Sequence, residues 1–261
     1  MSSSKAQDNN GFTLPELIVA MAMTAIVLTV VLTFLFYFWR YSYVLDYTQE
    51  SFTQRLNTND YLRDSLGSSV GLIIQNGLPD SHTNAPDPAI GSNLYWKLIH
   101  AVPTNYYTNG SGAVPLFYYR KYSSNSSGSY IMNGQQPYED EYVLYLDSDT
   151  KQMLLRSIPN TGATGNRLLA SCPPAIANSS CPSDKILIEN VESVGLRYFS
   201  RSGNPIDWTS VWDDLNNCYA GPDFPQAEVV ELTVNVSRKA RFSSSSSTKN
   251  STIIRVSLRN Y

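Results

Sequence analysis

The residue with the clearest chemistry in this sequence is Glu16, a carboxylate at the start of a long apolar run. From Leu17 to Trp39 the chain has 23 residues without a charge. A carboxylate deep in a bilayer costs roughly 2.5–3.5 kcal/mol, and somewhat less near the end of a segment, so it is expected to have a partner. Charge pairing is therefore the chemistry expected of Glu16. The plainer alternative is that Glu16 complements the helix dipole in the first turn.

Other reactive residues lack the spacing that catalysis or metal binding needs. The sequence has no H-E-x-x-H, no phosphate-binding glycine loop followed by Lys and Ser or Thr, and no G-x-S-x-G. It has no C-x-x-C and only two histidines. Asp147 and Asp149 leave calcium open as an alternative, but "LDSDTK" is also ordinary hairpin-turn chemistry. We expect no enzyme, no cofactor and no metal.

The three cysteines are consistent with export. Cys172 and Cys181 flank the short loop "CPPAIANSSC", and Cys218 lies further along the chain. A bond between Cys172 and Cys181 would stabilise the fold by roughly 2.5–3 kcal/mol in the chain-entropy model. Three cysteines allow three single pairings, and the sequence does not choose among them. Cys172 and Cys181 are therefore only a possible disulfide.

The element that must hold Glu16 is a membrane-spanning helix. The run from Leu17 to Trp39 would be about 35 Å long, enough to cross a hydrocarbon core of about 30 Å with some tilt. It ends in "FLFYFWRYSY", an aromatic cluster that suits a membrane–water interface. A buried helix of a soluble core rarely stays apolar on every face for so long. A secretory signal peptide would have roughly half this apolar length and a small-residue cleavage site.

The helix is expected to continue beyond the membrane. Residues 40–66 contain no Gly or Pro, and Gly67 marks the expected end. A helix from Phe12 to about Leu66 would be roughly 80 Å long. Apolar residues recur near multiples of 3.6 and predict one side against a partner surface. These residues are Leu45, Phe52, Leu56, Leu62 and Leu66.

The rest of the chain predicts a β-rich head. Short β-type stretches lie at 94–102, 114–122, 141–158 and 185–203, and two strands close the chain. The stretch 141–158 is expected to form a hairpin with its turn at Asp147–Thr150. The fold class is therefore α+β, a long N-terminal helix backing a β-rich globular head.

The two closing strands show the clearest alternation. Their inward residues are expected to be Val230, Leu232, Val234, Val236, Ile254, Val256 and Leu258. The connection "RKARFSSSSSTKNS" between them is expected to be a mobile loop. Its basic residues leave phosphate binding open as a hypothesis, but Phe242 is the only aromatic beside them. With a net charge of −3 as well, nucleic acid is not the expected partner.

The stretch "GFTLPEL" resembles the processing site of type IV prepilins and pseudopilins, the class III signal. The resemblance implies that a membrane-embedded prepilin peptidase cuts between Gly11 and Phe12. Phe12 would then be methylated, and its amine would meet Glu16 of a neighbouring subunit. Two features depart from the pattern: the leader has Lys5 balanced by Asp8, and Pro15 replaces an aliphatic residue. Proline is acceptable in a first helical turn.

The head adds a finer resemblance. "ILIENVESVGLRYFSRSGNPIDW" is similar to a segment of J-type pseudopilins and PilW-like minor pilins, and "TIIRVSLRN" is like their ending. The chain is also longer than a typical major pilin, which favours a minor subunit. Matching positions are Val191, Val194, Leu196, Tyr198, Gly203 and Trp208.

The resemblance implies a minor pilin or pseudopilin that assembles into, primes or caps a type IV pilus-like fibre. The expected parts are a leader (1–11), a transmembrane or fibre-core helix (12–39), an amphipathic stalk (40–70) and the head (71–261). The expected partners are the prepilin peptidase, other pilins or pseudopilins, the fibre assembly platform and the membrane, with the head outside the cytoplasm and an extracellular fibre after assembly. The alternative is a single-pass membrane-anchored adhesin or binding protein.

Overall fold

The structure is a computed structural model that describes residues 13–72, 77–80, 87–88, 94–97, 105–107, 112–206, 212–213, 218–219, 227–239 and 247–257. One helix is followed by seventeen strands in these ranges, all of them antiparallel where they pair in sheets. The α+β fold expected from the sequence is confirmed. The chain divides into two units, residues 1–53 and 54–261, and each is described by itself.

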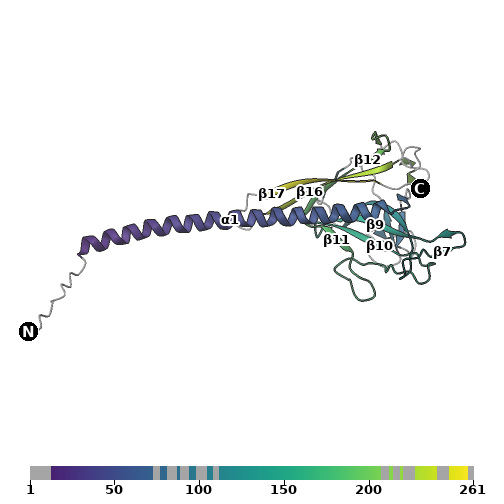
Figure 1. The fold of residues 1–261 in the computed structure, drawn as a ribbon, viewed down its shortest axis with the longest axis horizontal. Helices are drawn as coiled ribbons and strands as arrows, with labels where there is room; N and C mark the ends of the chain where they lie inside the picture. Colours follow the sequence, from purple (N-terminus) through teal and green to yellow (C-terminus); the bar gives the residue numbers. More distant parts are fainter. Residues whose placement is uncertain are drawn as a thin grey trace, which may run out of the picture. The chain divides into compact units, whose positions relative to one another are not determined.

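Helix α1 (Leu14–Gly67) is a single element (Figure 1). Its described part begins two residues after Phe12, which lies outside the described residues, and it ends one residue after Leu66, close to the expected end. The final turn is closed by the Ser68 amide and hydroxyl, which donate to the Asp64 carbonyl over 3.1 and 2.8 Å.

The second unit begins with the last turns of α1, which pack on the head. Leu62 and Leu66 are completely buried, and Thr58 and Ser65 are nearly so. The Ser65 hydroxyl lies 2.7 Å from the Tyr119 hydroxyl. These four positions have the i, i+4, i+7, i+8 spacing of one helix face. One stripe of α1 is thus part of the head core.

The expected apolar stripe along residues 40–66 is wrong in one respect. Leu45, Phe52 and Leu56 remain exposed by 49, 58 and 47%, whereas Leu62 and Leu66 are buried. At 100° per residue, Leu62 and Leu66 point about 120° and 80° away from Leu56. The five residues therefore belong to two faces of the helix. Within the second unit, Leu62 and Leu66 lie on the face that is buried in the head, whereas Leu56 lies on another face.

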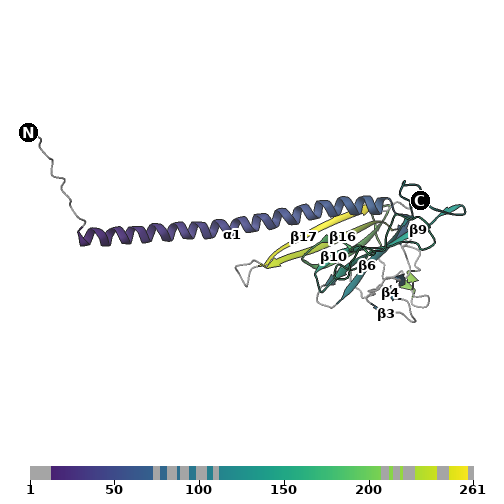
Figure 2. The same ribbon diagram turned by 90° about the horizontal axis from the view of Figure 1, so that it is seen from below.

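The first sheet has the order β1-β6-β9-β10-β11. Figure 2 shows its strands layered with the hairpin of the second sheet. Its strands are β1 (Gly71–Leu72), β6 (Ala113–Tyr122), β9 (Glu139–Asp147), β10 (Gln152–Ile158) and β11 (Lys185–Ile188).

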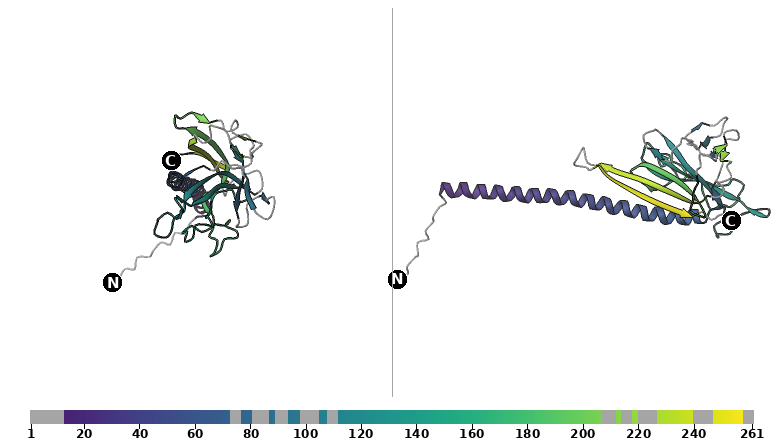
Figure 3. Two further views of the ribbon diagram at one scale, coloured as in Figure 1. Left: turned by 90° about the vertical axis from the view of Figure 1, so that its right-hand side faces the viewer. Right: turned by 90° about the horizontal axis from the view of Figure 1, so that it is seen from above.

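The second sheet has the order β13-β12-β16-β17, with β5 also pairing with β12. Its strands are β5 (Asn105–Tyr107), β12 (Val191–Ser200), β13 (Pro205–Ile206), β16 (Ala227–Lys239) and β17 (Ser247–Ser257). Figure 3 shows both sheets beside the last turns of α1. Smaller sheets are formed by β2 (Gly77–Asp80), β3 (Asp87–Pro88) and β4 (Leu94–Lys97), by β7 (Met132–Asn133) and β8 (Gln136–Pro137), and by β14 (Trp212–Asp213) and β15 (Cys218–Tyr219).

One apolar cluster joins α1 to both sheets. The alternation expected in the closing strands is confirmed for the described positions, because Val230, Leu232, Val234, Val236, Ile254 and Val256 are all buried in this cluster. Leu258 lies outside the described residues. The connection between the two strands is shorter than expected. Strand β16 continues to Lys239 and β17 begins at Ser247, because cross-strand pairing extends the hairpin into the serine-rich segment.

The hairpin expected at 141–158 is confirmed, with β9 ending at Asp147 and β10 starting at Gln152. The Asp147 carboxylate accepts the Asp149 and Thr150 amides over 2.9 and 3.3 Å. The Asp149 carboxylate accepts the Gly112 amide over 3.1 Å. Both carboxylates therefore hold backbone amides, which is the turn chemistry that the sequence also suggested.

The last turns of α1 cover the edge of the first sheet that is formed by β11. The Thr58 hydroxyl donates to the Leu187 carbonyl over 2.7 Å, and the Glu189 amide donates to the Gln54 side-chain carbonyl over 3.5 Å. Gln54 and Thr58 are one helical turn apart. They therefore reach two neighbouring backbone groups on the same edge, the Leu187 carbonyl in β11 and the Glu189 amide just after it. Covering an edge in this way blocks unwanted strand pairing.

A buried ionic cluster ties three distant segments of the head together. The Arg156 guanidinium, which is fully buried, lies 2.6 Å from the Asp80 carboxylate and 3.4 Å from that of Asp184. Trp96 donates to Asp80 over 2.9 Å, and Tyr145 donates to Asp184 over 2.7 Å. Burial raises the pKa of the Asp184 carboxyl. The hydrogen bond from the Ser171 side chain and the charge of Arg156 oppose that rise.

A disulfide joins Cys172 and Cys181, whose Cα atoms are 5.6 Å apart. The Cys172 amide donates to the Pro182 carbonyl over 2.8 Å, and the Asp184 amide donates to the Cys172 carbonyl over 2.6 Å. The bridge therefore closes the loop immediately before Asp184, at the buried ionic cluster.

Removing this disulfide is expected to destabilise the head without unfolding it. Replacing Cys172 and Cys181 together by Ser should lower the free energy of unfolding by about 2.5–3 kcal/mol, because the unfolded chain regains the entropy of the open loop. Denaturant unfolding of the full chain in detergent, followed by tryptophan fluorescence, measures this loss. A reductant should lower the stability of the unchanged chain but leave that of the double variant as it is.

Candidate functional site

The expected processing residues Gly11 and Phe12 lie outside the described residues, whereas Glu16 lies in the first turn of α1. Its side chain is exposed. One carboxylate oxygen of Glu16 accepts the backbone amide of Thr13 over 2.9 Å and the Thr13 hydroxyl over 2.8 Å. The Leu17 amide in turn donates to the Thr13 carbonyl over 3.1 Å, which makes Thr13 the residue where the helix begins.

This contact is half of a capping box, in which the third helical residue reaches back to the residue at the helix cap. Glu16 is therefore used within its own helix, where it also complements the positive end of the helix dipole. Pro15 lies between the two residues. Amide hydrogens in the first turn of a helix have no partner within the helix, so a proline, which lacks one, loses no hydrogen bond there. Our sequence interpretation did not single out Thr13, although the spacing T-x-x-E was a readable signal for it.

The apolar segment after Glu16 is exposed along its whole length in the described part of the chain. Every residue from Thr13 to Tyr41 is exposed, and the most apolar window has a mean hydropathy of 2.6. Monomeric soluble proteins rarely expose an apolar surface of this extent, so a membrane or another protein is expected to cover it. By length and composition the helix can cross a membrane.

The polar side chains in this segment are satisfied by their own helix. The hydroxyls of Thr24, Thr29 and Thr33 each donate to the carbonyl four residues earlier, at 2.8 Å. In lipid, where no water is available, such internal bonds make a hydroxyl tolerable. The segment Leu17–Trp39 therefore carries no charged side chain, and Glu16 lies immediately before it.

Cys172 and Cys181, the other pair singled out from the sequence, lie in the head and are joined to each other. Both are buried, with 5 and 7% of their surface exposed. In the described part of the chain, no group of three or more His, Cys, Asp or Glu residues is placed to hold a metal ion. The bonded pair is therefore a structural element of the head, separate from the N-terminal site.

Comparison with known proteins finds one family similarity. Residues 7–32 match the model of the prokaryotic N-terminal methylation motif. No curated protein and no solved structure matches the chain significantly. The matched residues include Gly11, Phe12, Thr13 and Glu16, and so they cover the whole N-terminal site. The match supports a type IV pilin-like protein that is anchored in a membrane by its N-terminal helix.

Proposed function

We propose that this chain is a minor pilin or pseudopilin that assembles into, primes or caps a type IV pilus-like fibre. The observation that carries the proposal is the methylation-motif match over residues 7–32, at the start of an exposed apolar helix with one carboxylate. The motif indicates a structural role rather than a catalytic one. The head, with its own two-sheet core, would lie outside the cytoplasm and be displayed by the fibre.

Processing would prepare the helix for assembly. A prepilin peptidase would cut between Gly11 and Phe12, and the new Phe12 amine would be methylated. The cut places a positive charge one residue before Thr13, at the end of α1 where Glu16 lies. In a bundle of parallel helices, that amine can meet Glu16 of a neighbouring subunit.

Glu16 would then have two alternative environments. In the lone subunit its carboxylate accepts two hydrogen bonds from Thr13, which reduces the cost of a charge at the edge of the membrane. In the fibre, the amine of a neighbour would add a full opposite charge in a medium of low dielectric constant. The carboxylate would thus be tolerated before assembly and stabilised by it.

The alternative of an anchored adhesin rests on one feature of the head. The segment from Ser123 to Tyr138 has no charged residue, and it carries the exposed side chains Tyr130 (61%) and Met132 (52%) beside the small β7–β8 hairpin. Uncharged loops rich in Tyr, Ser and Asn suit contact with another molecule. An anchored adhesin would keep residues 1–11, so the N-terminus of the mature protein separates the two functions.

Glu16 variants test the pairing role. Replacing Glu16 by Ala should leave membrane insertion intact, because the lone charge is a cost there. The fraction of subunit recovered in sheared fibres should fall about tenfold, which corresponds to ~1.4 kcal/mol. Quantitative immunoblotting of the membrane and fibre fractions measures both quantities.

Glu16→Gln is the matched control, because Gln also forms a capping box but has no charge. If charge pairing drives assembly, subunits with Glu16→Gln should be as poorly incorporated as those with Glu16→Ala. Normal incorporation of the Gln variant would mean that the capping contact alone is sufficient, and the pairing role would then be wrong.

A further inference from the structure

The hairpin of β16 and β17 continues beyond the sheet to which it belongs. Pairing between β12 and β16 ends at Val236. Beyond this position β16 and β17 remain paired with each other as far as Lys239 and Ser247. Figures 2 and 3 show this end of the hairpin reaching past the other strands of the head. We call the strand segments 237–239 and 247–249 the hairpin arm.

The hairpin arm lies at the end of the head where the chain enters it. The Ser237 amide donates to the Asn190 carbonyl over 3.0 Å, and the adjacent Glu189 amide donates to the Gln54 side-chain carbonyl over 3.5 Å. Gln54 is the first residue of the second unit. Only residues 40–53 join it to the apolar run. The arm therefore belongs to the end of the head that this short connection joins to the membrane segment.

The hairpin arm is basic, and its cross-strand neighbours are neutral. Three of its residues are Lys or Arg, and no acidic residue occurs from Ser237 to Tyr261. Opposite charges across two strands stabilise a sheet, but each basic position of the arm is opposite a hydroxyl residue instead. The opposite pairs are Ser237–Lys249, Arg238–Thr248 and Lys239–Ser247.

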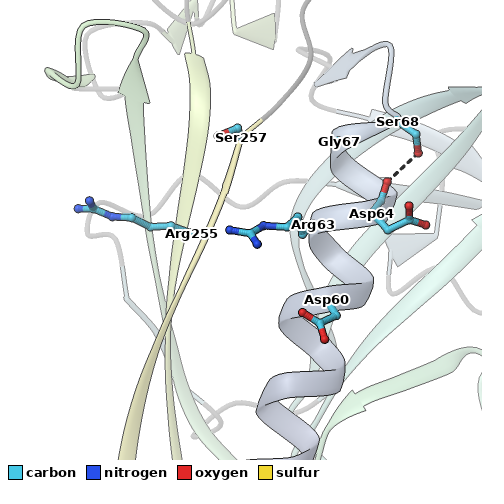
Figure 4. Close-up of a pocket in the computed structure, with 7 residues that line it drawn as sticks. All are labelled: Asp60, Arg63, Asp64, Gly67, Ser68, Arg255 and Ser257. Atoms are coloured by element: carbon cyan, nitrogen blue, oxygen red, sulfur yellow. Dashed lines mark hydrogen bonds between the residues drawn. The ribbon is translucent and has the colours of Figure 1, made fainter.

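The other end of the same hairpin is charge-compensated. Arg255 on β17 lies directly opposite Glu231 on β16 and forms an ion pair with it. Arg255 also lines the groove beside α1, where Asp60, Arg63 and Asp64 supply charges of both signs (Figure 4). The positive charge of β17 is thus matched by carboxylates at this end, whereas no such match exists between the strands of the hairpin arm.

The carboxylates at the chain-entry end lie at the base of the arm or on the first sheet. Glu192 accepts the Ser237 hydroxyl, and Glu189 accepts the Gln152 side-chain amide over 3.4 Å. Asp147 and Asp149 bind backbone amides at the β9–β10 turn. The basic residues of the arm continue up to two positions beyond Ser237, so positive charge is concentrated toward the tip of the hairpin.

We propose that the hairpin arm binds the anionic lipid headgroups of the membrane in which α1 is anchored, and so holds the head close to the bilayer before assembly. Lys and Arg are attracted to an anionic lipid surface within about one Debye length, ~8 Å at physiological salt. The membrane helix already tethers the head, so the arm would act as a second, intramolecular contact for which few charges suffice.

This contact rests on the membrane anchor of the proposed function, but it depends neither on cleavage at Gly11 nor on the charge of Glu16. A failure of processing or of fibre incorporation would therefore leave it in place. The contact would break when the subunit leaves the membrane for the fibre.

The test uses the full-length chain in lipid nanodiscs of phosphatidylcholine alone or with about a third phosphatidylglycerol. Acetylation of Lys239 and Lys249, followed by mass spectrometry, should be at least threefold slower in the anionic discs, because lipid phosphates would cover the two amines. High salt should remove the difference. Lys185, whose amine lies 3.1 Å from the centre of the Tyr61 ring, is the internal control and should change less than 1.5-fold. Equal rates in both lipids, or equal slowing at Lys185, would overturn the proposal.

Variants locate the contact on the hairpin arm. In the unchanged chain, hydrogen exchange in peptides covering residues 237–249 should be at least threefold slower in anionic than in neutral discs. Replacing Arg238, Lys239 and Lys249 together by Ser should abolish this difference. The matched control replaces three other basic residues of the head by Ser and should keep it. These residues are Lys151, Arg197 and Arg201. An equal loss in both variants would mean that net charge alone attracts the head, and the assignment would be wrong.

Nucleic acid is the other polyanion that such an arm could bind. Duplex DNA added to the neutral discs should slow exchange in residues 237–249 less than the anionic lipid does. Stronger protection by DNA than by lipid would assign the arm to nucleic acid and refute the membrane contact.

Discussion

Mature protein isolated from its native membrane is expected to begin at Phe12 with a methylated amine, and Gly11→Val is expected to abolish this processing completely. The expectation rests on the "GFTLPEL" stretch and the methylation-motif match over residues 7–32. Glycine has no Cβ, so a protease can approach the peptide bond closely there. A valine side chain at Gly11 would block that approach. Intact-mass spectrometry of the purified chain distinguishes the two forms.

Loss of processing should also prevent assembly. With the leader in place, Phe12 has no free amine, and Glu16 of a neighbour has no positive partner at that position. Asn10→Val is the matched control, since it adds a similar side chain one residue away from the cut. It should be processed. An assembled fibre that contains subunits with intact leaders would contradict both the cleavage site and the pairing mechanism.

The second large effect is expected in the head. Arg156→Met should lower the free energy of unfolding by about 3–5 kcal/mol, because it leaves the buried carboxylates of Asp80 and Asp184 without their cation. For a domain of this size the corresponding fall in Tm is roughly 10 °C. Thermal unfolding of the full chain in detergent measures it.

Two further variants define the cause of that loss. Arg201→Met removes an arginine whose side chain is 89% exposed, and it should change stability by less than about 0.5 kcal/mol. Combining Arg156→Met with Asp80→Asn and Asp184→Asn removes all three charges and keeps acceptors for Trp96 and Tyr145. It should be more stable than Arg156→Met alone. If it were less stable, unpaired charge would not be the reason for the loss.

The N-terminal half was predictable from the sequence because its determinants are local. Glu16, Thr13 and the apolar run lie within one continuous helix, where spacing alone places each side chain. The β9–β10 hairpin and the buried positions of β16 and β17 were predictable for the same reason, since strand alternation and turn residues act over a few positions. The one error in that half was to assign Leu45 and Leu62 to the same face of the helix. Small angular offsets at each repeat add up over several turns, so the two residues lie on different faces.

What the sequence by itself determined about this protein is therefore its local character: an N-terminal methylation motif, an apolar helix long enough to cross a membrane with one carboxylate at its start, and a β-rich head. Only the tertiary structure decided which distant residues meet. Arg156 is 76 residues from Asp80 and 28 from Asp184, and Thr58 is 129 residues from the strand edge it covers. Such contacts follow from packing of the whole core, which no local pattern encodes.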